Sequence, residues 1–338
     1  MFAAGLFIAL HFKKKYKYLK TILALFCRRM VKTISILIPV FNEESNVAAV
    51  AKAVAQVFES INYSFEILFV NDGSKDNSLN EIRKVSAADN RINYLSFSRN
   101  FGKDNALLAG LKHTRGDAVI TMDADLQHPP ELIPELISNW ENGHEVVYTF
   151  RKDRNQHASG FNQITSRLFY KIVNRLSNVD LEDGIADYRL LDKKVVDILS
   201  NLQEDYPFFR GLVKWVGYRQ IGIPYTPNER VSGETKYNTK ALFSLALQGI
   251  TSFSTKPLII AIYLGFIFSL LSLLYIPYVL FSLYYVRPIS GWSSLIVTVA
   301  FFGGLQLMIL GILGIYLGKS FMQNKQRPRF IIQEKKIH

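Results

Sequence analysis

Two long apolar stretches near the C-terminus constrain the fold of this 338-residue chain more than any other feature. One covers 257 to about 285 and the other 292 to about 317. Each exceeds the roughly 20 residues that an α-helix needs to cross a bilayer, and the link between them is short. The sequence therefore predicts a two-helix transmembrane hairpin, in preference to two buried helices of a soluble protein.

Basic residues flank this predicted hairpin on its outer sides, whereas only Arg287 lies in the link. Lys236, Lys240 and Lys256 precede the hairpin, and Lys319, Lys325, Arg327, Arg329, Lys335 and Lys336 follow it. The positive-inside rule places both flanks in the cytoplasm. The net charge of +12 would equally suit nucleic acid, phosphate ligands or anionic lipid, but this distribution favours the membrane over nucleic acid. We expect a multi-pass protein of the inner (cytoplasmic) membrane with its catalytic domain on the cytoplasmic side.

The region before the hairpin reads as alternating strands and helices. Strands are expected at 34–40, 65–70, 92–97 and 118–122, with helices at about 44–59, 77–88 and 104–114 between them. Such alternation is typical of a mostly parallel sheet covered on both faces. Ligands of open sheets of this kind bind at the carboxyl ends of the strands.

The expected organisation has five parts. They are a leader of uncertain role (1–31), an α/β domain (32–237), an amphipathic juxtamembrane helix (238–256), two transmembrane helices (257–318) and a basic cytoplasmic tail (319–338). The leader places its charges after an apolar run, the reverse of a secretory signal. We expect it to be an appendage or the product of an upstream start codon, rather than an interfacial anchor. The single cysteine, Cys27, excludes an intramolecular disulfide framework and a Cys-rich zinc site.

The paired carboxylates Asp123 and Asp125 follow the apolar strand 118–122 and are the strongest chemical signal. On an extended backbone, side chains two residues apart point the same way. Two carboxylates on one face suit a hard divalent cation, and Gln127 continues the alternation with another oxygen. Such a metal would bridge the phosphates of a nucleotide-sugar and stabilise the departing diphosphate. An ordinary acidic loop is the alternative, which the position after a buried strand disfavours.

Two further polar segments also follow expected strands. Asp72, in a sequence ideal for a turn, could accept hydrogen bonds from a nucleobase N–H or a ribose hydroxyl. Segment 99–104 combines Gly, basic residues and a helix start, which suits a loop that faces phosphate. A plain turn and a solvated connection remain open as the respective alternatives.

Asp187 and the segment 230–237 are candidates for the acceptor side of a site. Asp187 could orient a sugar, act as a general base, or simply form an ion pair with a neighbouring Arg. Arg230 and Lys236 lie just before the hairpin and suit an anion at the membrane surface. Generic attraction to anionic lipid would explain the same residues.

Taken together, these segments resemble polyprenyl-phosphate glycosyltransferases, inverting enzymes of GT-A fold that include dolichyl-phosphate mannose synthases and bacterial undecaprenyl-phosphate glucosyltransferases. The matching segments are 38–44, 70–76, 98–103, 122–130, 186–191, 214–217 and 230–237, in order and with fitting spacing. Phe41 and Ala186 depart from the Tyr and Gly of many relatives. The resemblance implies an α/β class: a GT-A (Rossmann-like), mostly parallel sheet domain followed by the transmembrane hairpin. The two spans look more like the bacterial glucosyltransferases than the soluble synthases.

The resemblance also implies a function. A hexose, with glucose favoured, would pass with inversion from a nucleotide-sugar, with UDP-glucose favoured, to undecaprenyl phosphate or another polyprenyl phosphate. The product would be a lipid-linked sugar for modification of cell-envelope glycans. By resemblance, Pro39, Phe41, Glu43, Asp72 and Asp123 bind the nucleotide, Asp123, Asp125 and Gln127 hold Mg²⁺ or Mn²⁺, Asp125 and Asp187 are catalytic, and Arg167, Arg210, Arg230 and Lys236 meet the acceptor phosphate.

The chemistry of the acceptor limits what Asp187 must do. A phosphate monoester has a second pKa of about 6 and is largely dianionic near neutral pH, so it is already a nucleophile. Positioning and electrostatics should dominate catalysis. We therefore interpret Asp187 as a positioning residue first and a base second.

Two rival functions are weighed against this one. A processive polysaccharide synthase usually carries a Gln-x-x-Arg-Trp motif, which is absent here, and two spans are few for a polymer channel. A catalytically inactive scaffold for lipid-carrier translocation would be expected to have lost its metal ligands, whereas Asp123 and Asp125 are present. The expected partners are the donor, the lipid acceptor and membrane lipids, and the sequence leaves the oligomeric state, including a homo-oligomer, open.

Overall fold

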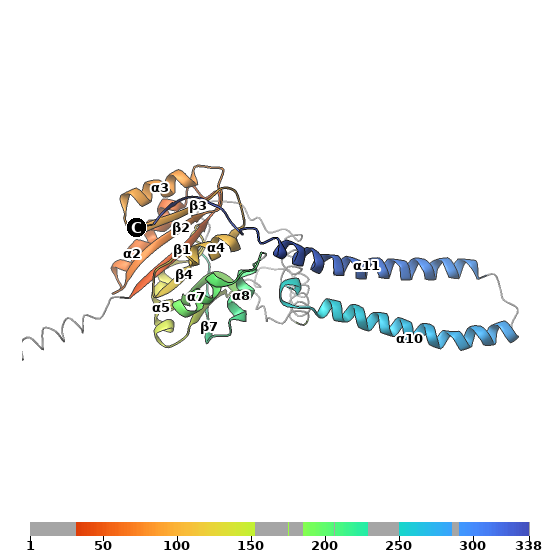
Figure 1. The fold of residues 1–338 in the computed structure, drawn as a ribbon. Coiled ribbons are helices and arrows are strands. Elements are labelled where there is room, and N and C mark those ends of the chain that lie inside the picture. Colours follow the sequence, from red (N-terminus) through yellow and green to blue (C-terminus); the bar gives the residue numbers. More distant parts are fainter. Residues whose placement is uncertain are drawn as a thin grey trace, which may run out of the picture.

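The computed structural model describes residues 32–152, 175, 185–205, 207–228, 250–285 and 291–337. An α/β domain carries a long antiparallel pair of helices on one side, and the C-terminus returns to the α/β domain (Figure 1). The leader 1–31 lies outside the described residues.

An eight-stranded sheet in the order β7-β5-β6-β4-β1-β2-β3-β8 forms the centre of the domain. The strands are β1 (Thr33–Val40), β2 (Ser64–Asn71), β3 (Ile92–Phe97), β4 (Ala118–Thr121), β5 (Val146–Arg151), β6 (Ile185–Asp192), β7 (Gln220–Tyr225) and β8 (Ile332–Lys336). The neighbours β4, β1, β2 and β3 pair in parallel, whereas β6 runs antiparallel to β4 and to β5. The expected mostly parallel α/β sheet is confirmed.

Helices cover both faces of the sheet, because the strands are apolar on both sides. Ile34, Ile36 and Ile38 of β1 join one buried cluster, and Leu37 joins the cluster on the opposite face. The first cluster includes side chains of α2 (Val47–Glu59), α3 (Ser78–Ala88) and α5 (Ile133–Glu141); the second includes side chains of α4 (Lys103–Leu111), α7 (Lys193–Asn201) and α8 (Phe209–Trp215). The near-continuous burial of β1 is what a strand enclosed by two helical layers requires.

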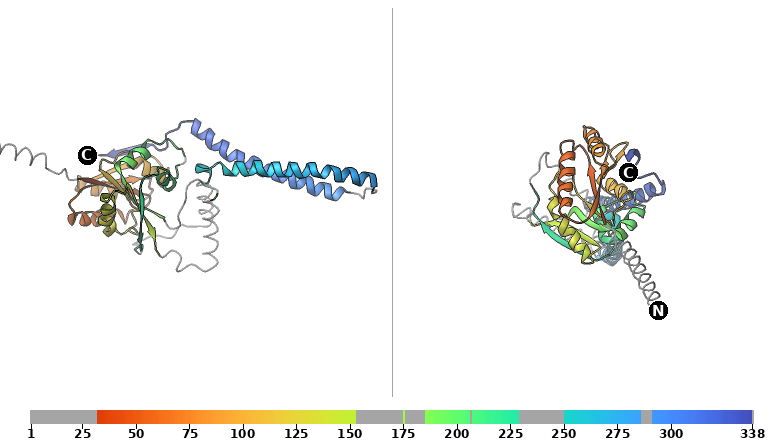
Figure 2. Two further views of the ribbon diagram at one scale, coloured as in Figure 1. Left: turned by 90° about the horizontal axis from the view of Figure 1, so that it is seen from below. Right: turned by 90° about the vertical axis from the view of Figure 1, so that its left-hand side faces the viewer.

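Two long helices, α10 (Lys256–Tyr285) and α11 (Trp292–Asn324), project together from the domain (Figures 1 and 2). Judged by length and composition alone, one described segment, Ser294–Asn324, could cross a membrane, and Lys256–Leu271 is a shorter apolar helical stretch. Large apolar side chains of α11 face outward, with Leu307 71% and Leu317 72% exposed. These helices are therefore not a core buried within this chain, and their surfaces require apolar surroundings.

The segment expected as a basic tail has more structure than its composition indicated. Residues up to Asn324 continue α11, and β8 then pairs antiparallel with β3 at the edge of the sheet. The run Gln333 to Lys336 is polar, so it gave no apolar alternation from which a strand could be predicted. Most of the expected juxtamembrane helix, 238–249, lies outside the described residues, and residues 250–253 are helical.

Candidate active site

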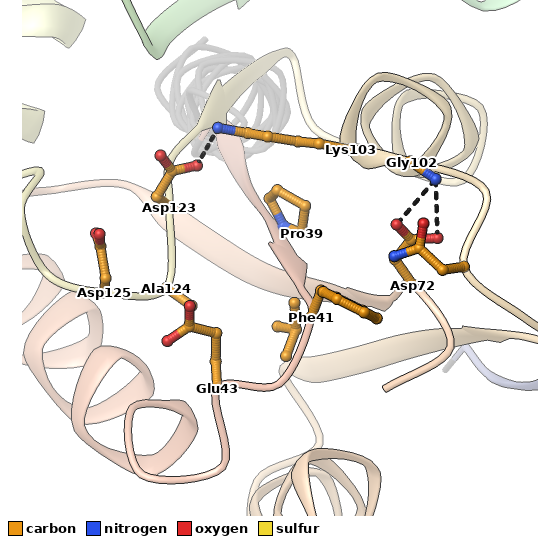
Figure 3. Close-up of a pocket in the computed structure, with 11 residues that line it drawn as sticks. Pro39, Phe41, Glu43, Asp72, Gly102, Lys103, Asp123, Ala124 and Asp125 are labelled. Carbon is orange, nitrogen blue, oxygen red and sulfur yellow. Dashed lines mark hydrogen bonds and ion pairs between the residues drawn. The ribbon is translucent and has the colours of Figure 1, made fainter. Parts of the chain in front are cut away.

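A cavity of about 390 Å³ opens at the carboxyl ends of the parallel strands. It is lined by Pro39, Val40, Phe41, Glu43, Asp72, Asn100, Gly102, Lys103, Asp123, Ala124 and Asp125 (Figure 3). These residues come from the ends of β1 and β4 and from the loops after β2 and β3. The structure thus brings together six of the seven residues that sequence reasoning placed at the nucleotide and metal sites, and the seventh, Gln127, does not line the cavity.

Asp72 is buried, with 3% of its surface exposed, and it holds the loop that follows β3. Its Oδ1 accepts a hydrogen bond from the Phe101 N–H at 2.7 Å, and its Oδ2 accepts one from the Gly102 N–H at 3.0 Å. Burial raises the pKa of Asp72, and these two hydrogen bonds and Arg99 oppose that rise. The residue lies in an irregular segment, 72–74, directly after β2, and it lines the cavity.

Asp123 and Asp125 line the cavity, but the backbone that carries them differs from the expected extended strand. The strand β4 ends at Thr121, residues Ala124 and Asp125 form a turn, and Leu126 has a φ of +58°. Side chains therefore do not alternate along an extended backbone here, and that part of the prediction is wrong. The turn nevertheless leaves both carboxylates on the cavity wall (Figure 3).

Gln127 follows this turn and is not among the residues that line the cavity. Its backbone N–H donates to Asp125 Oδ1 at 3.1 Å, and its side-chain Oε1 accepts from Arg151 Nη2 at 3.2 Å. The turn explains the difference, because it ends the alternation that would have aligned Gln127 with the two aspartates. In this arrangement Gln127 supports Asp125 through the backbone.

Lys103 forms ion pairs with two carboxylates, one that lines the cavity and one that is buried beyond it. Its Nζ lies 2.6 Å from Asp123 Oδ1 and 2.9 Å from Asp187 Oδ2 (Figure 3 shows the first contact). The two carboxylates raise the pKa of Lys103 and keep it charged. Sequence reasoning placed Lys103 in a loop facing phosphate, but it did not foresee this bridge, which depends on a contact between β6 and the start of α4.

Asp187 lies behind Lys103 in a cluster of cations. Arg210 donates to it through Nε at 2.7 Å and Nη2 at 2.9 Å, and Arg189 Nη2 lies 3.6 Å from its Oδ1. These cations hold the pKa of Asp187 well below its usual range despite burial. A carboxylate so stabilised is a poor general base, and the ion pair that was left open as an alternative is what the structure contains.

His128 lies within the matching segment 122–130, and sequence reasoning assigned it no role. The Asp123 N–H donates to its Nδ1 at 2.9 Å, which places the ring proton on Nε2. That nitrogen lies 3.9 Å from Asp123 Oδ2. Burial lowers the pKa of His128, so the ring is neutral near pH 7, and it stacks on Tyr188 with centroids 5.1 Å apart. His128 therefore fixes the backbone that carries Asp123.

Three of the four residues predicted to meet the acceptor phosphate, Arg167, Arg230 and Lys236, lie outside the described residues. The fourth, Arg210, is the partner of Asp187 at the start of α8. Their common role in binding the acceptor remains a prediction.

The cavity suits a divalent cation only together with a phosphorylated ligand. Within the described ranges, no three His, Cys, Asp or Glu side chains are grouped to hold a metal ion. Mg²⁺ sites in phosphate-binding proteins commonly use one or two carboxylates, with substrate phosphates completing the coordination. Asp123 and Asp125 supply two such carboxylates on one wall, so the residues fit a cation that arrives with a diphosphate.

The chain is similar to known proteins in sequence and in fold. Residues 35–199 match the family described as Glycosyl transferase family 2. The chain is 42% identical over 301 residues to the uncharacterized glycosyltransferase YkcC of Bacillus subtilis (strain 168), covering 89% of this chain and 93% of that one. It is 41% identical over 304 residues to the bactoprenol glucosyl transferase of Shigella phage SfV, covering 90% and 99%. Among solved structures, mannosyl-3-phosphoglycerate synthase from Rubrobacter xylanophilus matches with 15% identity and a TM-score of 0.44, covering 64% and 71%.

Proposed function

We propose, from the premise that the chain belongs to glycosyl transferase family 2, that it transfers a glucosyl group from UDP-glucose to a polyprenyl phosphate. The product is a lipid-linked sugar that is inverted at the anomeric carbon. The observation that carries the proposal is the cavity at the ends of the parallel strands, which Asp72, Asp123 and Asp125 line together. The bactoprenol glucosyl transferases, matched over nearly their whole length, support the choice of sugar and lipid.

The donor occupies the cavity in this proposal. Phe41 and Asp72 line the end of the cavity that takes the nucleoside. An aromatic ring suits a nucleobase, and a buried carboxylate can accept hydrogen bonds from a nucleobase N–H or a ribose hydroxyl. Asp123 and Asp125 border the diphosphate. Mg²⁺ or Mn²⁺ held there would neutralise the charge that develops on the departing diphosphate. Lys103, already positive beside Asp123, adds to the same electrostatic stabilisation.

The acceptor phosphate attacks the anomeric carbon without needing a strong base. Its second pKa of about 6 leaves it dianionic near neutral pH, and one direct displacement inverts the configuration. Asp187 is held ionised by Arg210 and Lys103, so it orients these two cations rather than removing a proton. We assign Arg210, with Arg167, Arg230 and Lys236, to the path by which the acceptor phosphate reaches the donor.

The helix pair keeps the lipid acceptor near this cavity. We propose that α10 and α11 both cross the cytoplasmic membrane, with the α/β domain on the cytoplasmic side. The outward-facing apolar side chains of α11 support this arrangement. Lys256 at the start of α10 and Lys319 near the end of α11 lie at the domain end of the pair, as the positive-inside rule requires.

The test uses the purified full-length chain in lipid. It is incubated with undecaprenyl phosphate and, in separate reactions, with UDP-glucose, UDP-galactose, UDP-N-acetylglucosamine or GDP-mannose. Mass spectrometry of the lipid fraction should show one hexose per lipid with UDP-glucose, and NMR should show a β-linkage from the α-configured donor. A sugar polymer would instead indicate a processive synthase, and no lipid-linked sugar with any donor would contradict the proposal.

A further inference from the structure

The end of the chain returns from the helix pair to the donor side of the α/β domain. After α11, β8 lies antiparallel along β3, with Ile332 paired to Phe97 and Glu334 to Ser96 (Figure 1). The strand β3 ends at Phe97, and the next residues, 98–103, form the loop that borders the cavity. The last strand therefore lies directly beside the root of this loop, which we call the donor loop.

Contacts from the tail reach the first residues of the donor loop. The Ser98 N–H donates to the Ile331 carbonyl at 3.0 Å. The Phe330 ring stacks on the buried Phe97 ring with centroids 5.2 Å apart and an interplanar angle of 12°. Phe97 in turn meets Phe101 edge-on, with centroids 5.7 Å apart. Three aromatic rings thus run in a row from the tail to the middle of the donor loop.

Phe101 is the point at which the donor loop is held against the nucleotide end of the cavity. Its N–H donates to Asp72 at 2.7 Å, and the next N–H, that of Gly102, donates to the same carboxylate. Asn100, Gly102 and Lys103 line the cavity on either side of this contact. A displacement of the Phe101 ring would therefore move three lining residues and the partners of Asp72.

We propose that Phe330 is a positioning residue of the donor site: it packs through Phe97 onto Phe101 and holds the donor loop against Asp72. The segment after α11 thereby completes a site that is otherwise built by the N-terminal half of the chain. This inference rests on the proposed function for the identity of the ligand in the cavity. The predicted effect falls on the donor rather than on the lipid acceptor, because the three rings lead to Asp72.

Glu334, in the middle of β8, offers a matched control. Glu334 accepts hydrogen bonds from Arg83 and from the Tyr94 hydroxyl, on the side of β3 away from the donor loop. Glu334→Gln weakens the attachment of the same strand without removing a ring from the row. A merely structural role for β8 would make Glu334→Gln and Phe330→Ala alike in their effects.

The experiment compares full-length wild type, Phe330→Ala, Phe330→Tyr and Glu334→Gln in lipid. Hydrogen exchange without ligand should be faster at the amides of 98–103 in Phe330→Ala, and near the wild-type rate in the other two variants. The KM for UDP-glucose should rise about threefold to tenfold in Phe330→Ala, the range expected for one lost aromatic pair. The KM for undecaprenyl phosphate should stay unchanged, and Phe330→Tyr should keep the wild-type donor KM.

Equal exchange in Phe330→Ala and Glu334→Gln, or a donor KM unchanged by Phe330→Ala, would overturn the proposal. If Phe330→Ala does not fold, Phe330→Leu keeps apolar contact but removes the stacked ring, and the same comparison applies to it. If no protein, wild type included, transfers glucose, the proposed function fails, while the exchange rates of 98–103 still decide whether Phe330 positions the loop.

Discussion

The guanidinium of Arg210 donates two hydrogen bonds to the carboxylate of Asp187, from Nε to Oδ1 at 2.7 Å and from Nη2 to Oδ2 at 2.9 Å. Bidentate pairs of this kind are among the strongest that proteins form. With Lys103 on the second oxygen, they hold the pKa of Asp187 well below its usual range. The buried anion thus contacts two cations, Lys103, which lines the cavity, and Arg210, and these contacts determine what its substitution should do.

Asp187→Asn should lower kcat by about tenfold or more, because Lys103 and Arg210 lose the charge that orients them. The acid side of the pH profile should keep its midpoint near the second pKa of the acceptor phosphate, about 6. Measuring kcat from pH 5 to 9 in wild type and variant checks this. Were Asp187 the base, the variant would lose that acid limb, and the role assigned here would be wrong.

Asp104, in the first turn of α4, predicts a pH-dependent stability. Burial and the nearby Asp187 raise its pKa to about 6 in the folded protein, above the usual carboxyl range. The folded state therefore favours the protonated form, and stability is lost as the pH rises from about 4 to about 6. Asp104→Asn removes this loss and should raise the Tm above that of wild type at pH 8.

The two proteins should converge in Tm towards pH 4, where Asp104 is protonated in the folded state and about half protonated in the unfolded state. The stabilisation at pH 8 should be about 3 kcal/mol, as a rise of the pKa from 3.8 to about 6 implies. Melting curves of the full-length chain at pH 4, 6 and 8 test the prediction. A difference in Tm that does not change with pH would contradict it.

Substitutions of His128 test whether this residue acts by accepting the hydrogen bond from the Asp123 N–H. His128→Ala removes the acceptor of the Asp123 N–H and leaves a buried donor unpaired, at a cost of about 1–3 kcal/mol. Transfer activity should fall because Asp123 is displaced. His128→Asn can present an oxygen to the same N–H and should recover part of the activity. Equal kinetics in the two variants would show that the hydrogen bond does not matter.

Alanine substitutions at Gly73 and Gly102 test how tightly the donor loop packs against the loop after β2. Both have positive φ, +63° and +97°, but a Cβ on Gly73 would lie 2.3 Å from the backbone carbon of Arg99, whereas a Cβ on Gly102 would meet nothing within 4 Å. Gly102→Ala should cost backbone strain of about 1–3 kcal/mol. Gly73→Ala should cost more, because the donor loop must also move. Thermal melts compare the two, and a smaller loss for Gly73→Ala would refute this packing.

The sequence sufficed for those parts of the fold that depend on apolar patterning. The strand 34–40 was predicted because its residues are apolar on both faces. Asp72, Asp123 and Asp125 were predicted because they follow strands that end at one edge, whereas Pro39, Phe41 and Glu43 were predicted from the family resemblance. The position of Gln127 was missed because a local turn at Leu126, not the strand, directs the chain. The polar strand Ile332–Lys336 was missed because its pairing depends on Arg83 and Tyr94, more than 200 residues earlier.

Most of the cation cluster around Asp187 could not be predicted from the sequence. Lys103 and Arg210 come from α4 and α8, and only the folded domain brings them to the Asp187 carboxylate, whereas Arg189 lies two residues along the same strand, β6. The sequence marked each residue as charged, which left both an ion pair and a catalytic base open. The structure contains the ion pair, and the part that Asp187 plays in catalysis stays a prediction.

The most direct test of the central claim is the transfer of labelled glucose from UDP-glucose to undecaprenyl phosphate by full-length wild type, Asp125→Asn and Asp197→Asn. Asp125 lines the cavity, whereas Asp197 is an exposed partner of Lys193 on α7 and serves as the control. Wild type and Asp197→Asn should form lipid-linked glucose at similar rates when Mg²⁺ or Mn²⁺ is supplied, and excess chelator should stop both. Asp125→Asn should form little product while it keeps the wild-type Tm. Full transfer by Asp125→Asn, or by wild type in chelator, would contradict the account.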